Sequence, residues 1–283
     1  MRPVVFIVLS LLSVWFGPAQ RTAPSEVRVV PVKELTLDPN ASVWSSVAFY
    51  TAKLVPQDLV TPKLLEPSTQ EIQVRGISDG TNIAIRLEWL DKTLDDRPRP
   101  GAFPDACAIQ LPTTIAPVTP VIAMGQPSLP VDMTFWRADW QAIVDGRADT
   151  INVLYPNASI DHYNANAKPL EKNIAAQTEF SMRESPARAL GNRRAGPREQ
   201  PVEDLVGLGP MDLRPATNSF SKGRGVRTSS GWAVVLSRPI PKGFSRSNPT
   251  NIAFAVWEGS HAEVGARKMR TAWVRLIMED LVR

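Results

Sequence analysis

Apolar residues recur mostly with period two from residue 27 onward, in short runs interrupted by Pro, Gly, Asn and Asp. The clearest run is 81–89 (TNIAIRLEW), where one face carries only large apolar residues: Ile83, Ile85, Leu87 and Trp89. The same alternation recurs in further runs: 70–77, 106–111, 131–136, 232–236, 252–257 and 271–278. Period-two alternation is typical of strands with one buried face, and about eight or nine such strands predict an all-β fold, an antiparallel sandwich or barrel.

Helix signals are scarce, because 26 prolines interrupt most longer candidates and only 138–145 could form a turn or two. Residues 157–230 are rich in Asn, Arg, Pro and Gly and show little alternation. We interpret them as a long irregular insertion in one domain that spans residues 27–283. Its Arg-rich part, 183–198, and the turn at 98–104 are each either a docking surface or a solvated loop.

The N-terminus has the pattern of a secretory signal. Met1 and Arg2 precede an uncharged apolar run at 4–16 (VVFIVLSLLSVWF), and small residues follow up to Ala19. A membrane span needs roughly 20 apolar residues, so we expect residues 1–19 to be a signal peptide cleaved near Ala19 and the mature protein to be periplasmic. The alternative is an uncleaved tether. The single cysteine, Cys107, fits export.

Composition excludes several classes of site. One Cys and two His in 283 residues rule out a disulfide framework, a Cys-rich metal cluster, covalently attached haem and most histidine-based metal sites. The excess of 32 Lys and Arg over 28 Asp and Glu is too small to indicate a nucleic-acid partner. No nucleotide-binding, zinc-protease or serine-hydrolase motif stands in its required context, so the residues show no catalytic machinery.

Two stretches carry a more specific signal: 120–140 (PVIAMGQPSLPVDMTFWRADW) and 252–273 (IAFAVWEGSHAEVGARKMRTAW). In order and spacing they resemble the haem-binding γ subunits of periplasmic molybdoenzymes related to dimethyl sulfoxide reductase. That family includes ethylbenzene and dimethyl sulfide dehydrogenases, chlorate and selenate reductases and nitrite oxidoreductases. The resemblance runs from about Val43 to the C-terminus and is weakest through the insertion. Val264 departs from the Asp that relatives often carry there.

The resemblance implies a β-sandwich of immunoglobulin-like or DOMON-like type that holds one non-covalent b-type haem between a Met and a Lys. These axial ligands would be Met124 and Lys268, with Trp136, Trp257 and Arg267 as further cofactor-binding residues. A thioether is a soft, neutral ligand that favours ferrous iron. Lysine binds a metal only as the neutral amine, so the site must lower its pKa by burial and by competition with the proton.

Other residues near the two motifs are weaker candidates. Phe135 and Phe254 would help to line a dry pocket, and Arg137, like Arg267, could bind haem propionates. Met133 is a rival ligand, although alternation groups it with Val131 and Phe135 as a packing face, and Met269 should point away from Lys268.

Plain structural interpretations stand beside the functional ones. Met124 could be core filler and Lys268 a solvated surface charge. His162, inside the insertion, and His261, near the second motif, are more simply loop residues.

By this resemblance the chain is a non-catalytic electron-transfer subunit. It would pass single electrons between an iron–sulfur β subunit, joined to a molybdenum-containing α subunit, and an external cytochrome c. A nitrite oxidoreductase or a nitrate or chlorate reductase complex would suit it, and the substrate would be decided in another chain. The alternative is a secreted β-sandwich carbohydrate-binding module without haem, using exposed residues among its eight Trp as stacking platforms.

Overall fold

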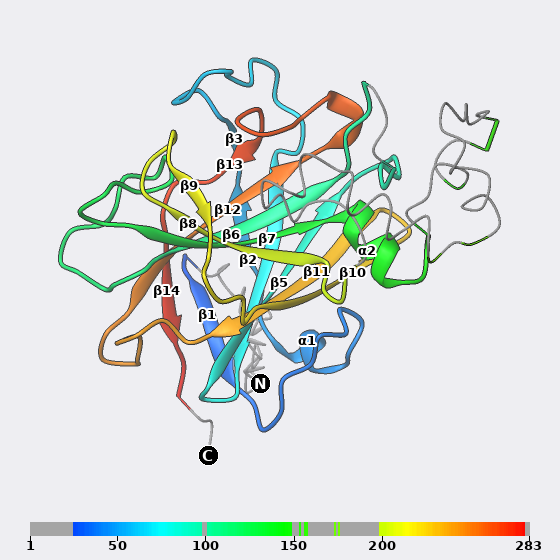
Figure 1. Ribbon diagram of the computed structural model, residues 1–283. Coiled ribbons are helices and arrows are strands. Elements are labelled where there is room, and N and C mark those ends of the chain that lie inside the picture. The colour runs from blue at the N-terminus through cyan, green and yellow to red at the C-terminus, as the bar shows by residue number, and fades with distance from the viewer. Residues whose placement is uncertain are drawn as a thin grey trace, which may run out of the picture.

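The computed structural model describes residues 25–97, 101–148 and 198–280, together with a few isolated positions between 153 and 175 (Figure 1). Its strands are β1 (Val27–Pro31), β2 (Tyr50–Lys53), β3 (Val55–Pro56), β4 (Glu71–Ser78), β5 (Asn82–Leu90), β6 (Ala106–Pro112), β7 (Val131–Arg137), β8 (Val202–Gly207), β9 (Leu213–Pro215), β10 (Lys222–Arg227), β11 (Gly231–Pro239), β12 (Thr250–Trp257), β13 (Met269–Arg270) and β14 (Val274–Met278). Its helices are α1 (Val43–Ser46), α2 (Ala138–Val144) and the 3-10 turn η2 (Gly259–His261).

The strands form one continuous sheet that folds over into two layers. One layer runs β10-β11-β5-β4-β1-β14, and the other runs β12-β6-β7-β8-β9 (Figure 1). Strand β12 belongs to both, because residues 250–252 pair with β14 and residues 253–257 pair with β6. Side chains of both layers meet in one hydrophobic core. This confirms the expected all-β sandwich.

One strand departs from the antiparallel pattern. Strand β1 is parallel to both of its neighbours, β4 and β14. Hairpin connections impose antiparallel pairing, and β1 has no hairpin connection to either neighbour. The sheet is therefore mixed at this position and antiparallel in its other pairings among the described residues.

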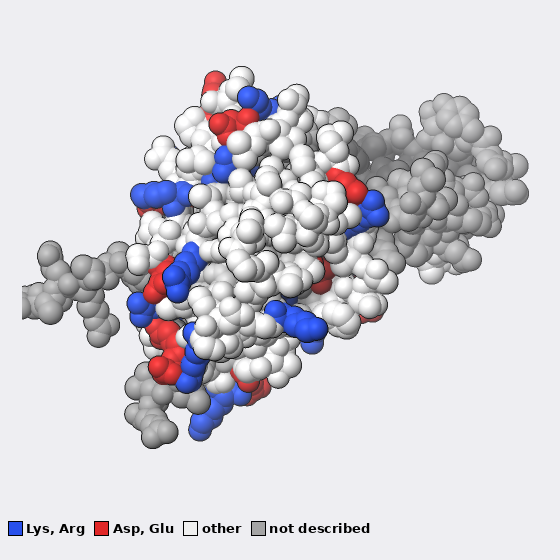
Figure 2. Space-filling view, turned by 90° about the vertical axis from the view of Figure 1, so that its left-hand side faces the viewer, with Lys and Arg blue, Asp and Glu red and all other residues white. Residues whose placement is uncertain are grey.

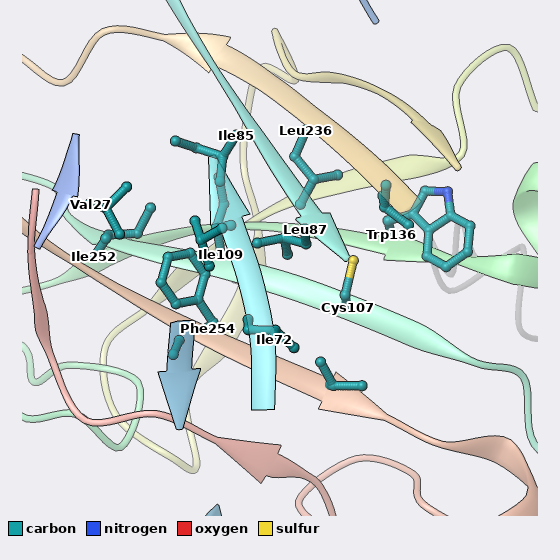
Figure 3. Packing of buried hydrophobic residues seen from close by; sticks show 14 of the residues in the cluster. Val27, Ile72, Ile85, Leu87, Cys107, Ile109, Trp136, Leu236, Ile252 and Phe254 are labelled. Carbon is teal, nitrogen blue, oxygen red and sulfur yellow. The ribbon is translucent and has the colours of Figure 1, made fainter. Parts of the chain in front are cut away.

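The core follows the alternation of the sequence. The apolar face of β5, from Ile83 to Trp89, packs inward against Leu236 of β11 and against β6 and β12 of the opposite layer (Figure 3). Cys107 is a free, buried cysteine in the same interior, where burial raises the pKa of its thiol well above the usual value. Each fully buried Leu or Ile contributes about 1.5–3 kcal/mol relative to an exposed position. The face predicted to be buried is buried.

Part of the expected insertion belongs to the sheet. Residues 202–227 form β8, β9 and β10, which corrects the expectation that they are irregular. Strand β10 (KGRGVR) hides its alternation because Gly223 and Gly225 stand where inward apolar residues would be expected. A Cβ at Gly225 would lie 2.3 Å from Cζ2 of Trp136, so the indole fills that space instead. The Arg-rich residues 183–197, His162 and positions 98–100 of the turn lie outside the described residues.

The remaining expectations on segments have separate outcomes. Helix α2 lies where the sequence predicts it, whereas α1 has no sequence signal. Residues 1–24, with the expected signal peptide, lie outside the described residues. Within the described part of the chain, no helix is long and apolar enough to cross a membrane.

The segment 106–131 contains no Lys, Arg, Asp or Glu. It includes β6 and the loop that leads to β7, and Val118 and Val121 of that loop are exposed. Figure 2 shows one face of the molecule whose middle is mostly uncharged, with charged side chains gathered nearer its edges.

Candidate cofactor-binding site

The outer face of the β12-β6-β7 layer has a floor of small side chains. Cys107 and Ile109 of β6 point into the core, so Ala106 and Ala108 point outward. Ala255 of β12 pairs directly with Ala108, and Trp257 pairs with Ala106. Methyl side chains leave the space above the strands open, whereas large residues at these positions would fill it. The result is a flat, apolar floor.

A recess opens over this floor. It occupies about 570 Å³, counted together with the part that is open to solvent. Its lining is mostly apolar and comes from the 57–60 loop, β6, the 122–124 turn, β7, β12 and the 266–271 segment: Gln57, Leu59, Val60, Ala108, Gln110, Ile122, Ala123, Met124, Met133, Ala253, Phe254, Ala255, Trp257, Ala266, Lys268, Arg270 and Thr271. Both predicted axial ligands are therefore brought to one recess from distant parts of the chain.

Met124 stands on a strained turn. Its φ is 63°, in the left-handed region, where a non-glycine residue costs about 1–3 kcal/mol. Neighbouring bonds hold it there, because its carbonyl accepts from Gly209 N at 2.9 Å and Gly125 N donates to Val121 O at 2.9 Å. Gly125 also has positive φ, and a Cβ there would lie 2.9 Å from Gly207 O. The fold therefore maintains an unfavourable conformation at the predicted ligand.

Lys268 lies directly before β13, with its amine inside the recess. Met269 is fully buried in the core, so Lys268 and Arg270 lie on the opposite side, as alternation predicts. The Lys268 amine is 4.9 Å from the centre of the Trp257 ring. Burial of the amine, and to a lesser degree the positive charge of Arg270, lowers the pKa of Lys268 from 10.5 to about 8. A lysine in this environment loses its proton more easily than a surface lysine does.

Trp257 forms part of the wall and steadies the loop before Lys268. Its indole N–H donates to Gly265 O at 3.0 Å, and its ring meets Phe135 edge-to-face with 5.0 Å between ring centroids. The structure thus places Trp257 at the recess, and its role in binding the cofactor stays a prediction.

Trp136 does not line the recess, which corrects the expectation from the sequence. It is fully buried in the core, packs edge-on against Trp89 and Trp232, and donates its indole N–H to Gln141 at 3.2 Å. Its place on β7 explains this, since Phe135 takes the outward position and Trp136 the inward one.

The two arginines expected to face haem propionates also lie elsewhere. Arg137 forms a two-bond pair with Asp139, at 2.9 and 2.8 Å, and stacks over Trp140. Arg267 is not among the lining residues, although it precedes Lys268 directly. His261 is exposed, lies 3.7 Å from Glu258, and is likewise absent from the lining.

Four polar lining residues, Gln57, Gln110, Arg270 and Thr271, were missed by the sequence interpretation. Period-two alternation from Lys268 would have placed Arg270 on the same side. The alanines of 106–108 and 253–255 were a further signal, because small residues alternating on two strands indicate a face kept open. Met133 packs with Val131, as expected, and also lines the recess, so it remains a rival thioether.

The donor set suits a planar metal-bearing group better than a bare cation. Thioether and amine donors stand at the sides of an apolar floor, and among the described residues no group of three or more His, Cys, Asp and Glu could hold a metal ion. A flat metal-bearing group could enter the recess over the alanine floor, where a soft and a nitrogen donor are both available. The exposed-Trp platform of the carbohydrate-binding alternative is missing, since no Trp in the described part of the chain is exposed.

Fold and recess together define a β-sandwich protein with an apolar recess on the outer face of one layer. Comparison of sequences then assigns it: the family described as ethylbenzene dehydrogenase matches residues 41–269, and the chain belongs to that family. A putative respiratory nitrate reductase haem subunit of Haloferax mediterranei is 22% identical over 95% of this chain and 79% of its own length. The chlorate reductase γ subunit of Ideonella dechloratans is 25% identical over 91% and 88%. These matches confirm the resemblance inferred from the two motifs.

Solved structures give a fainter likeness. A family 9 carbohydrate-binding module from Caldicellulosiruptor kristjanssonii, in complex with glucose, aligns with a TM-score of 0.43 at 8% identity, over 90% of this chain and 96% of that chain. The same module with cellotriose gives 0.42 at 6% identity. At these scores the likeness adds nothing to the assignment.

Proposed function

We propose that this chain is the b-type cytochrome subunit of a periplasmic molybdoenzyme complex and transfers single electrons without catalysing bond chemistry itself. The observation that carries the proposal is the meeting of Met124 and Lys268 in one recess. Each residue comes from one of the two motifs, and the motifs lie far apart in sequence. Family membership and the names of the relatives support haem binding and a place in a reductase complex.

The residues of the recess have distinct roles in this proposal. Met124 and Lys268 would hold the iron, the alanines would accommodate the ring, and Trp257 would exclude water. When bound, the haem supplies an iron centre that cycles between Fe(II) and Fe(III). If Met124 and Lys268 both bind the iron, the chain would leave no open iron position to a substrate. A lowered lysine pKa favours the neutral amine that ligation needs.

Partners and location are part of the same proposal. An α subunit with molybdenum and a β subunit with iron–sulfur clusters would deliver or receive electrons on one side, and a soluble cytochrome c on the other. Export through the N-terminal signal would place the chain in the periplasm with them. The chlorate reductase γ subunit and the nitrate reductase haem subunit support a multi-subunit oxidoreductase of this kind.

Reconstitution with haem tests the proposal. The mature chain, residues 20–283, should show a Soret band with haem and a b-type pyridine haemochrome. Met124→Leu and Lys268→Gln should each disturb the low-spin spectrum and lower haem retention at least tenfold, because each removes one iron bond. Met133→Leu is the matched control and should leave the spectrum unchanged. Absence of a Soret band in the wild type would refute the cytochrome function, and an unchanged spectrum in a ligand variant would remove that residue.

A further inference from the structure

Arg270 brings an unused hydrogen-bond donor to the recess. One of its terminal nitrogens lies 3.1 Å from Asp58 and the other 3.4 Å from the carbonyl of Thr271. Its Nε is buried and has no hydrogen-bond partner. A buried donor without an acceptor destabilises the folded protein, more so when the group is charged, so such a group indicates a missing partner.

The strand register places Arg270 at the edge of the alanine floor. Arg270 of β13 pairs with Ala255 of β12, and Ala255 pairs with Ala108 of β6. These three residues lie in one row across the outer face, with Arg270 next to the alanines. A planar group lying over the alanines would therefore have one edge beside the guanidinium.

The charges of the recess favour an anion at that edge. Lys268 and Arg270 are its two cationic lining residues, and no acidic residue is among those that line it. Asp58, the acidic neighbour of Arg270, has a side chain that is 67% exposed, so solvent weakens the ion pair between the two residues. The planar fork of arginine matches a carboxylate, which accepts two parallel charge-assisted bonds.

We propose that Arg270 binds a carboxylate side chain of the macrocycle that occupies the alanine floor, and so selects a haem that carries free propionates. The inference rests on the proposed haem-binding function. Arg270 takes the place of Arg137 and Arg267 as the residue that binds the carboxylate, because neither of them lines the recess and Arg137 is already paired with Asp139.

Two haems that differ only in their carboxylates test the assignment. Protohaem and its dimethyl ester have the same ring and iron, and the ester cannot accept the same ionic bonds. Titrations of the apoprotein chain should show that the wild type binds protohaem about 10–100-fold more tightly than the ester, which is about 1.4–2.7 kcal/mol, because only protohaem can accept charge-assisted bonds. Arg270→Gln should lose this difference by weakening protohaem binding alone. Arg267→Gln is the matched control and should keep the difference.

Each outcome decides between assignments. Equal loss of both haems in Arg270→Gln would mean that Arg270 only supports the fold, and a selective loss in Arg267→Gln would restore the sequence expectation. Either result overturns the proposal. If Arg270→Gln does not fold, the wild-type comparison decides, because equal affinity for the two haems overturns the proposal without any variant. Binding of neither haem by the wild type would refute the cytochrome function itself.

Discussion

The two faces of β6 and β12 share one backbone and have opposite compositions. The inner face carries Ile109, Phe254 and other large residues that fill the core between the layers. The outer face carries Ala108, Ala255 and other small residues that leave a recess. One face stabilises the sandwich by being full, and the other can accept a group because it is empty. Substitutions on the two faces should therefore produce separable effects.

The largest expected effect is on the inner face. Ile109→Ala removes a fully buried side chain and should lower the free energy of unfolding by about 2–5 kcal/mol, because it leaves a cavity as well as losing buried area. Urea denaturation of the apoprotein measures this. Under conditions where the variant is folded, its haem stoichiometry should equal that of the wild type. A loss below 1 kcal/mol would contradict the assigned core.

The next effect is on the outer face. Ala255→Leu fills the floor of the recess and should lower haem affinity at least tenfold, about 1.4 kcal/mol, while the free energy of unfolding of the apoprotein changes by about 1 kcal/mol or less. Haem titration and urea denaturation separate the two quantities. Ala255→Gly, which leaves the recess open, is the matched control for haem binding. Wild-type affinity in Ala255→Leu would show that the ring does not lie on this floor.

A smaller effect concerns the end of the layer where β6 begins. Asp105 accepts hydrogen bonds from Trp232 Nε1 at 3.0 Å and Gly259 N at 2.9 Å, so it joins β11 to the loop after β12. Burial, with a smaller contribution from the charge of Asp91, raises the pKa of Asp105 from 3.8 to about 7, although the hydrogen bonds that it accepts, above all the one from Gly259 N, act in the opposite direction. The folded state therefore binds a proton between these values that the unfolded state releases.

The sign of the pH dependence follows from this difference. The Asp105 contribution is fully present below pH 3.8 and is lost as pH rises through about 7, with a slope of at most about 1.4 kcal/mol per pH unit. Asp105→Asn cannot titrate and should flatten that slope, although it also loses an acceptor. Urea denaturation from pH 5 to 8 compares the two proteins. Parallel profiles would show that Asp105 does not titrate in this range.

The sequence was informative where the direction of a side chain depends only on its position along a single strand. Alternation predicted the buried face of β5 and the opposite directions of Lys268 and Met269. It failed at β10, where Gly225 gives its inward place to the ring of Trp136. The space beside Gly225 is filled by a side chain of β7, and the sequence of β10 alone cannot show which side chain of another strand packs there.

What the sequence by itself determined was the all-β class, most of the strands and the two motifs that resemble the haem-binding family. Only the tertiary structure decided that Met124 and Lys268 line one recess, that alanines from β6 and β12 form its floor, and that Arg270, rather than Trp136 or Arg267, stands at its edge. The physical reason is the distance along the chain over which each feature is determined. Alternation is imposed by the local backbone, whereas a recess is the space that distant strands and loops leave between them when the layers pack.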